Sequence, residues 1–404
     1  MDRGRSPAKV LAVTTLSHVM QHIYVGSSVL LPLIVEELRL SYTEFGLAMA
    51  ASSLIGGLSQ ILFSVASRRI ARHILLGLGN ILLSLGTLLM GLSRKFMDFL
   101  GARLISNVGV APQHPMGTAI ISERFNGKSL GRAIGFHYGV AYIGNVVGPV
   151  LMTLLAVMWG WRSTLFIFSM PALVVGLIVI WYLREGKRKI GKDGEAGENG
   201  SRSNLKTDVV TLVKTKSVVP ILAAQALLSG GIDLGMLTTY IPLFLADFLQ
   251  MDVYVRGMVY TIGLLGGVVG PILLGECAGR IGYVKVSLLS SGLASLLTYM
   301  LVFYKPASQT MLISLHLFIL MFMSFSLPTL LQSHLVKITS GYNRDLVVGI
   351  FFTIGFGFGS LWVGIVGRII DVYASFEPAF ILMGSLGLAA LALLLSQVKS
   401  AGVK

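Results

Sequence analysis

Charged residues are scarce in this chain, and their scarcity excludes most soluble folds. Only 12% of the 404 residues are charged, while 54% are hydrophobic, whereas ordinary soluble domains hold roughly 25% charged residues. A soluble fold with so few charges would not have enough polar surface to cover itself. The composition therefore indicates an integral membrane protein.

Cysteine is nearly absent as well. A single residue, Cys277, excludes a disulfide framework and a cysteine-rich metal site. The histidines His18, His22 and His114 could begin a metal site, but no carboxylate or cysteine completes it. An intramembrane enzyme would need a nucleophile with its base or a metal cluster, and neither occurs at a recognisable spacing. We therefore expect no catalytic residue, no metal and no cofactor.

Long apolar runs are abundant instead. About 20 apolar residues cross roughly 30 Å of hydrocarbon, and the 47 glycines suit close packing between membrane helices. The sequence predicts an all-α integral membrane protein with twelve transmembrane helices. The predicted spans are 10–35, 44–66, 74–93, 97–119, 130–157, 163–184, 218–246, 254–278, 285–304, 309–337, 345–370 and 375–396.

The basic residues predict the orientation of these spans. If the N-terminus is cytoplasmic, 24 of the 32 Lys and Arg residues fall in cytoplasmic segments and seven fall outside. This asymmetry follows the positive-inside rule and places both termini in the cytoplasm. It also accounts for the net charge of +14 without a nucleic-acid partner. We expect a multi-pass protein of the cell membrane that is monomeric and has the lipid bilayer as its surroundings.

The chain is organised as two similar halves. Residues 1–184 and 218–404 each hold six predicted spans, and 185–217 form a polar cytoplasmic linker. Pro32-Leu33 at the end of the first span recurs as Pro242-Leu243 at the end of the seventh. Such a duplication is typical of transporters, because two pseudo-symmetric six-helix bundles can move around a site between them. The alternative is that Gly and Pro recur by chance.

Two short turns carry a known motif. After the second span, Ser67-Arg68-Arg69-Ile70-Ala71-Arg72 keeps the arginines of an Asp-Arg-x-Gly-Arg-Arg turn but not its acid or glycine. After the eighth span, Gly275, Arg280 and Gly282 match the same turn, again without the acid. With the duplicated halves, these turns resemble those of the major facilitator superfamily, and the resemblance covers almost the whole chain. It implies the major facilitator fold and a conformational role for both turns.

Further motifs lie in the fourth and fifth spans. Arg103 and Gly109 are similar to the superfamily's Arg-x-x-x-Gly-x-Gly, and Gly144, Gly148 and Pro149 are similar to the Gly-x-x-x-Gly-Pro motif of its exporter branch. A narrower resemblance is to the fosmidomycin-resistance subgroup of drug efflux proteins. It is carried by the segments His18-Val19-Met20-Gln21-His22 and Gln113-His114-Pro115, with His22 in place of an acid or Asn.

Polar residues inside the spans mark a candidate cavity. An ionisable group at bilayer depth costs at least about 2.5–3.5 kcal/mol and should face the bundle interior or water. His18 and His22 share one helical face because they are four residues apart. The alternative is that such histidines only bond neighbouring helices, and His316 and His334 lie near span ends. The candidate residues for a substrate or proton cavity are His18, Gln21, His22, Tyr24, Arg103, Gln113, His114, His137, Asn145, Gln225 and Asp233.

Asp233 is the only carboxylate deep inside a predicted span. It lies about fifteen residues, or roughly 22 Å, into the seventh span, where it could carry a proton or pair with Arg103. Gly230, Gly231 and Gly235 predict a loosened helix around it, and Pro112 and Pro115 predict a kink in the fourth span. Arg103 could instead bind an anionic solute or extend toward water.

The functional hypothesis is a secondary transporter that works by alternating access. The motif of the fifth span favours proton-coupled export, as an antiporter, of a drug-like compound or metabolite. The alternatives are uptake of a metabolite, proton-coupled or facilitated, and a membrane protein that only senses a ligand.

Overall fold

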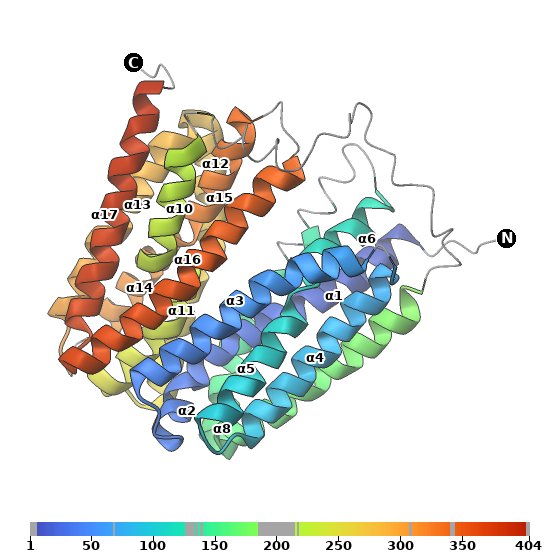
Figure 1. Ribbon diagram of the computed structural model, residues 1–404. Coiled ribbons are helices and arrows are strands. Elements are labelled where there is room, and N and C mark those ends of the chain that lie inside the picture. Colours follow the sequence, from blue (N-terminus) through green and yellow to red (C-terminus); the bar gives the residue numbers. More distant parts are fainter. Residues whose placement is uncertain are drawn as a thin grey trace. The chain divides into compact units, whose positions relative to one another are not determined.

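The computed structural model describes residues 6–67, 69–125, 133, 136–137, 140–184, 215, 218–306, 309–339 and 344–400. Within these residues the regular structure is all helical, as predicted. Nine of the described helical segments are long and apolar enough to cross a membrane. The chain divides into two compact units, Met1–Leu40 with Ala51–Gly194 and Ser41–Ala50 with Glu195–Lys404 (Figure 1). Each unit is described by itself.

In the first unit, the described helices follow the predicted spans. The chain first forms α1 (Pro7–Val25), the 3-10 helix η1 (Gly26–Leu30) and α2 (Leu31–Glu37), then α3 (Tyr42–Ala66), whose first residues belong to the second unit, α4 (Arg72–Leu92), α5 (Phe96–Val110), the π-helical turn η2 (Gln113–Gly117), α6 (Thr118–Ser122) and α8 (Gly144–Tyr182). Gly160 adopts φ 76° inside α8, a left-handed conformation open to glycine, and this break separates the fifth predicted span from the sixth.

The second unit repeats the pattern. Its helices are α10 (Val218–Gly231), α11 (Leu234–Leu243), the π-helical turn η3 (Phe244–Phe248), α12 (Val253–Ile281), α13 (Tyr283–Met300), the 3-10 helix η4 (Leu301–Phe303), α14 (Thr310–Ser324), α15 (Ser326–Ile338), α16 (Arg344–Tyr373) and α17 (Glu377–Ser400). When α8 is divided at Gly160, the described helices group into segments that fit the twelve predicted spans. The predicted start of the fifth span falls largely outside the described residues.

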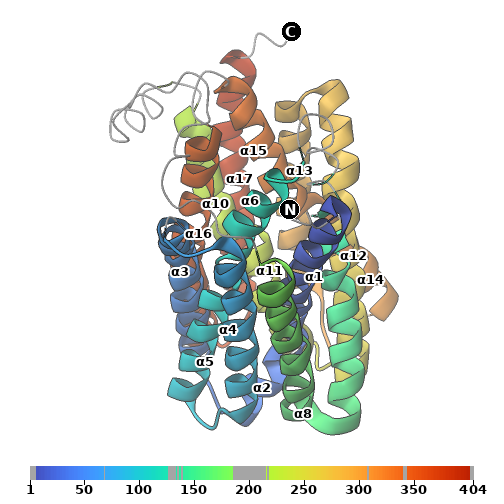
Figure 2. The same cartoon turned by 90° about the vertical axis from the view of Figure 1, so that its right-hand side faces the viewer.

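Glycines set the distance between neighbouring helices. In the first unit α4 packs against both α5 and α8 (Figure 2), and a Cβ at Gly176 would lie 2.8 Å from the carbonyl oxygen of Gly77. In the second unit α10 packs against α16 and α17 (Figure 1). There a Cβ at Gly231 would lie 2.7 Å from the carbonyl oxygen of Met383. Without a hydrophobic driving force between membrane helices, such close backbone approach supplies the packing energy.

Two helices are interrupted where the sequence predicts it. The seventh span breaks between α10 and α11, where Asp233 is extended with φ −78° and ψ 162°. The fourth span passes from α5 into the π-helical turn η2 next to Pro112. Both breaks confirm the predictions made from the nearby glycines and prolines, because proline lacks the N–H that continues a helix and glycine lowers helix stability.

Candidate functional site: a buried polar network in the first unit

A stripe of polar side chains runs along α1. Thr14, Ser17, His18 and Gln21 are all buried, and they recur every three or four residues, which is the spacing of one helical face. Their polar contacts reach groups of α4, α5 and η2, so their hydrogen bonds join different helices. The first unit therefore has a polar interior.

Hydroxyl and amide groups form the inner part of this network. The Ser17 hydroxyl donates to Gln113 Oε1 at 2.6 Å and accepts from Asn80 Nδ2 at 2.7 Å. Gln113 Nε2 lies 3.5 Å from the carbonyl oxygen of Thr14, and Gln21 Nε2 donates to the carbonyl oxygen of Val110 at 2.9 Å. The Val110 carbonyl is available because the helix is interrupted just beyond it.

Three imidazoles gather around that of His18. Its ring centroid lies 4.6 Å from that of His137, 4.8 Å from that of His22 and 5.3 Å from that of His114. Nε2 of His18 and Nε2 of His22 are 3.3 Å apart, and Thr15 Oγ1 lies 3.1 Å from His137 Nδ1. His18 is only 1% exposed, whereas His22 is half-buried and His114 is exposed. The cluster is therefore accessible from the side of His22 and His114.

The start of α8 holds the outer edge of the cluster. Asn145 Oδ1 lies 2.9 Å from Nδ1 of His22, and the Tyr142 ring meets the His22 ring edge-on at 5.0 Å. Gly144 allows this approach, because a Cβ there would lie 2.7 Å from both the His22 Cβ and the Val19 carbonyl oxygen. Asn145 and His22 thus join two helices more than a hundred residues apart.

Arg103 of α5 lies beside Tyr24 of α1. Its Nη1 donates to the Tyr24 hydroxyl at 2.9 Å, and its Cζ lies 5.6 Å from the centroid of the Tyr24 ring. Arg103 is only 9% exposed, and its Nε has no hydrogen-bond partner among the described residues. No described carboxylate lies within 4.0 Å of the guanidinium. The main polar partner of the buried Arg103 guanidinium is therefore the phenol of Tyr24.

Nine of the eleven predicted cavity residues thus lie in the first unit, and the other two lie in the second. Gln225 of α10 is buried, and its Oε1 has no partner among the described residues. Asp233 is half-buried at the N-terminus of α11 and makes no side-chain hydrogen bond to that terminus. The described part of the chain holds no group of three or more His, Cys, Asp or Glu that could hold a metal ion.

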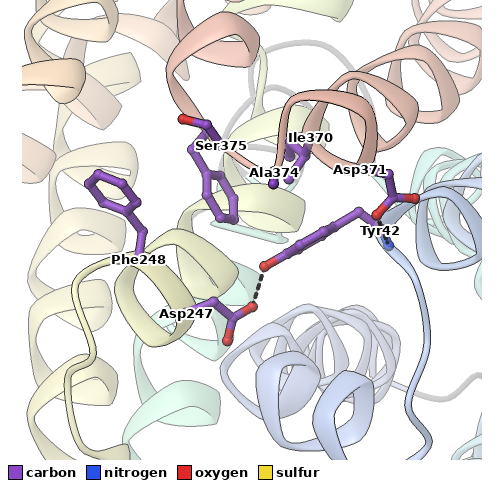
Figure 3. A pocket seen from close by; sticks show the side chains of 8 residues that line it. Tyr42, Asp247, Phe248, Ile370, Asp371, Ala374 and Ser375 are labelled. Atoms are coloured by element: carbon purple, nitrogen blue, oxygen red, sulfur yellow. Dashed lines mark hydrogen bonds between the residues drawn. The ribbon is translucent and has the colours of Figure 1, made fainter.

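A separate pocket of about 300 Å³ lies in the second unit, whose residues include the start of α3. Tyr42 donates from its hydroxyl to Asp247 at 2.5 Å and from its backbone N to Asp371 at 2.8 Å (Figure 3). Burial, and then the hydrogen bond to Asp247, raise the pKa of Tyr42, which precedes the predicted span 44–66. The phenol therefore stays protonated and acts as a donor. Phe248 and Phe376 complete the aromatic lining.

Comparison with protein families decides the class of the molecule. The family model described as Major Facilitator Superfamily matches residues 11–361. The chain belongs to the Major Facilitator Superfamily. This confirms the resemblance read from the motifs.

Individual members of the superfamily are more distantly similar. The chain is 26% identical over 266 residues to the "Probable L-galactonate transporter" of Escherichia coli (strain K12), covering 64% of this chain and 57% of that protein. It is 22% identical over 271 residues to the "Multidrug resistance protein MdtG" of Proteus mirabilis (strain HI4320), covering 65% of each. The matched stretches thus span less than two thirds of either relative.

Among solved structures, the chain is similar to the crystal structure of the nucleoside transporter NupG. The TM-score is 0.78 at 13% identity, over 97% of this chain and 99% of that one. At this identity the likeness shows the fold alone, and it agrees with the major facilitator fold predicted from the sequence.

The superfamily's turn motifs are built differently in the two halves. Arg72 forms an ion pair with Glu123 at the end of α6, so a carboxylate from another helix lies beside this arginine although the turn lacks its own acid. In the second half Arg280 pairs with Glu276 at 2.5 Å within α12, and Gly282 makes the turn itself with φ 104°. No neighbouring atom lies within 4 Å of a Cβ built at Gly275. Arg68 lies outside the described residues.

Two residues of the network are not among the candidates predicted from the sequence. Ser17 and Asn80 link α1, α4 and η2, but neither was a candidate. Ser17 lies at helical spacing from Thr14 and Gln21, and Asn80 lies at helical spacing from Ser84 and Thr87. A search for polar residues on one helical face would therefore have found both. His73, the histidine outside the predicted spans, is buried in the first turn of α4.

Proposed function

We propose that this protein is a secondary transporter that moves a small solute across the membrane by alternating access. Residues 1–184 and 218–404 act as the two six-helix bundles, and residues 185–217 are the cytoplasmic linker between them. The proposal is carried by the buried polar network of the first unit, because ionisable groups inside a membrane bundle are typical of solute and proton pathways. Membership of the superfamily supports the same conclusion.

Proton coupling is the second part of the proposal. Asp233 interrupts the seventh span, and helix breaks of this kind line the binding sites of transporters. A half-buried carboxyl at that depth and imidazoles in the first unit are groups that can bind and release protons. In this scheme, proton traffic through Asp233 and the histidines drives solute movement.

Export of a drug-like compound or metabolite is the proposed direction. The Gly-x-x-x-Gly-Pro motif at residues 144–149 supports it, as does similarity to a relative named for multidrug resistance. Uptake of a metabolite is the second candidate, because another relative is named as an L-galactonate transporter. A ligand sensor of the same fold is the alternative without transport.

The charge distribution supports a location in the cell membrane, with both termini in the cytoplasm. We propose that the protein works there as a monomer. Cysteine residues introduced near either end of the chain, labelled from one side of the membrane in a variant without Cys277, would test the orientation.

Proton flux into proteoliposomes tests the transport proposal. Solutes that stabilise the purified protein are added to liposomes holding a pH-sensitive dye, and we expect solute-dependent proton movement. Asp233→Asn should abolish it and Asp233→Glu should retain part of it, while Glu377→Gln, an exposed carboxylate in the same unit, serves as the matched control. Full proton-dependent transport by Asp233→Asn would exclude the role given to this residue.

A further inference from the structure

The interior of the first unit is positively polarised. Its four described acidic residues, Glu36, Glu37, Asp98 and Glu123, all lie at or next to a helix end. The network around α1 consists of hydroxyls, amides, imidazoles and Arg103. The one permanent charge of the described interior is therefore positive.

Arg103 has unused hydrogen-bonding capacity. One of its nitrogens donates to Tyr24, and its Nε is unpartnered although the side chain is more than nine-tenths buried. A buried charge without a counter-charge is costly. A guanidinium also presents its donors in a planar fork that matches a carboxylate in two parallel hydrogen bonds. The guanidinium of Arg103 can therefore bind an anionic ligand, because no described carboxylate pairs with it.

Neutral polar groups continue from Arg103 along α1. Tyr24 lies at one end and His18 at the other, six residues or roughly 9 Å apart along the helix, and Gln21 and His22 lie between them. Asn145 borders this row from α8. Such groups bind hydroxyls as donors and as acceptors. The row is long enough for an extended chain of about six carbon atoms.

We propose that Arg103 and the polar row on α1 form a binding site for a small hydroxylated carboxylate, in which Arg103 binds the carboxylate and the amides and imidazoles bind the hydroxyls. This inference rests on the proposed transport function and specifies the class of its substrate. The site selects against neutral and cationic molecules of the same shape, because neither supplies a negative charge to pair with the Arg103 guanidinium.

Three probes with one carbon skeleton test the proposal. D-gluconate, D-sorbitol and N-methyl-D-glucamine carry similar hydroxylated chains but are anionic, neutral and cationic. Binding to the purified protein is measured by calorimetry and by thermal shift. We expect gluconate to bind at least about tenfold more tightly than the other two, as a charge-assisted pair of hydrogen bonds implies.

Variants of Arg103 separate recognition from folding. Arg103→Gln should remove the preference for gluconate, and Arg103→Lys should keep a weaker preference, because an ammonium retains the charge but not the fork. Arg94→Gln, which removes an exposed arginine from the same unit, should bind like the wild type. If Arg103→Gln does not fold, the three probes on the wild type and on Arg103→Lys still decide the question.

Several results would overturn the proposal. Equal binding of the three probes, an undiminished preference in Arg103→Gln, or no binding of any four- to seven-carbon hydroxylated acid would each do so. The binding measurements do not depend on transport. They can therefore refute the binding site even if solute-dependent proton flux is observed. Conversely, if gluconate binding depends on Arg103 but no proton flux is observed, the transport proposal is refuted and the binding-site proposal is supported.

Discussion

Gly148 of α8 lies against Ile23 of α1 with no room for a side chain between them. A Cβ at position 148 would lie 2.7 Å from the carbonyl oxygen of Ile23 and 3.0 Å from its Cα. Gly144 makes the same approach one turn earlier, against Val19. A Cβ at Gly26 would in turn lie 2.6 Å from Cδ of Pro149. The Gly-x-x-x-Gly-Pro motif therefore forms the close packing of α8 on α1 that brings Asn145 to His22.

Enlarging Gly148 should separate these helices. We expect Gly148→Val to lower stability by about 1–3 kcal/mol through overpacking and to reduce solute-dependent proton flux. Scanning fluorimetry of the purified protein measures the change in melting temperature. Gly101→Ala in α5 is the control, because a Cβ there meets no atom within 4 Å. Equal effects of the two substitutions would contradict the close-packing role.

Removing the Ser17 hydroxyl should take one hydrogen bond from each of two buried amides. Gln113 Oε1 loses its donor and Asn80 Nδ2 loses one of its acceptors, so Ser17→Ala should cost about 1–3 kcal/mol. Ser169→Ala removes a hydroxyl that bonds only to the nearby carbonyl of Phe166, and its expected cost is smaller. Thermal melting compares the two, and a Ser17→Ala protein as stable as the wild type would exclude a structural role for the network.

His22 and Asn145 should be energetically coupled. A double-mutant cycle of His22→Ala and Asn145→Ala, read by thermal or denaturant unfolding, should give an interaction energy of at least about 0.5 kcal/mol. The physical reason is the hydrogen bond of 2.9 Å between their side chains. Independent, additive losses would show that this bond contributes nothing to the packing of α1 and α8.

Gly230 should be intolerant of any side chain. A Cβ there would overlap the ring of Trp362, whose Nε1 donates to the carbonyl oxygen of Ala226 at 3.2 Å. We expect Gly230→Ala to destabilise the second unit by about 1–3 kcal/mol, and Gly230→Ala with Trp362→Leu to recover part of the loss. Gly235→Ala is the control beyond the helix break, because a Cβ there has open space. Failure of the double variant to improve on Gly230→Ala would argue against this contact.

Asp371 should stabilise the start of α3. Its carboxylate accepts the backbone N–H groups of Tyr42 and Thr43, in the manner of a helix N-cap, although it comes from another helix. Asp371→Ala should therefore cost about 0.5–2 kcal/mol, measured as a lower melting temperature. Asp371→Asn should cost less, because an amide oxygen can still accept. The same loss in both variants would indicate that charge, and not the hydrogen bonds, is the main contribution.

The positions of the helices follow from properties of contiguous residues, and the sequence therefore predicts them well. The length of an apolar run fixes a span, and a glycine or proline weakens the helix where it stands. For this reason the sequence predicted the break before α11 and an interruption of the fourth span near Pro112. The shared face of His18 and His22 is likewise local, because it needs only the helical repeat.

The partners of these residues belong to the tertiary structure alone. Asn80 bonding to Ser17, Glu123 pairing with Arg72 and Asp371 capping α3 join segments that are 51 to 329 residues apart. Each depends on how far a helix is rotated about its axis and how deeply it is inserted, and the apolar pattern of one chain leaves both undetermined. The sequence by itself determined a twelve-span major facilitator fold and its polar residues. Only the packing of the helices decided which of them meet, because hydrogen bonds require distances that no single helix defines.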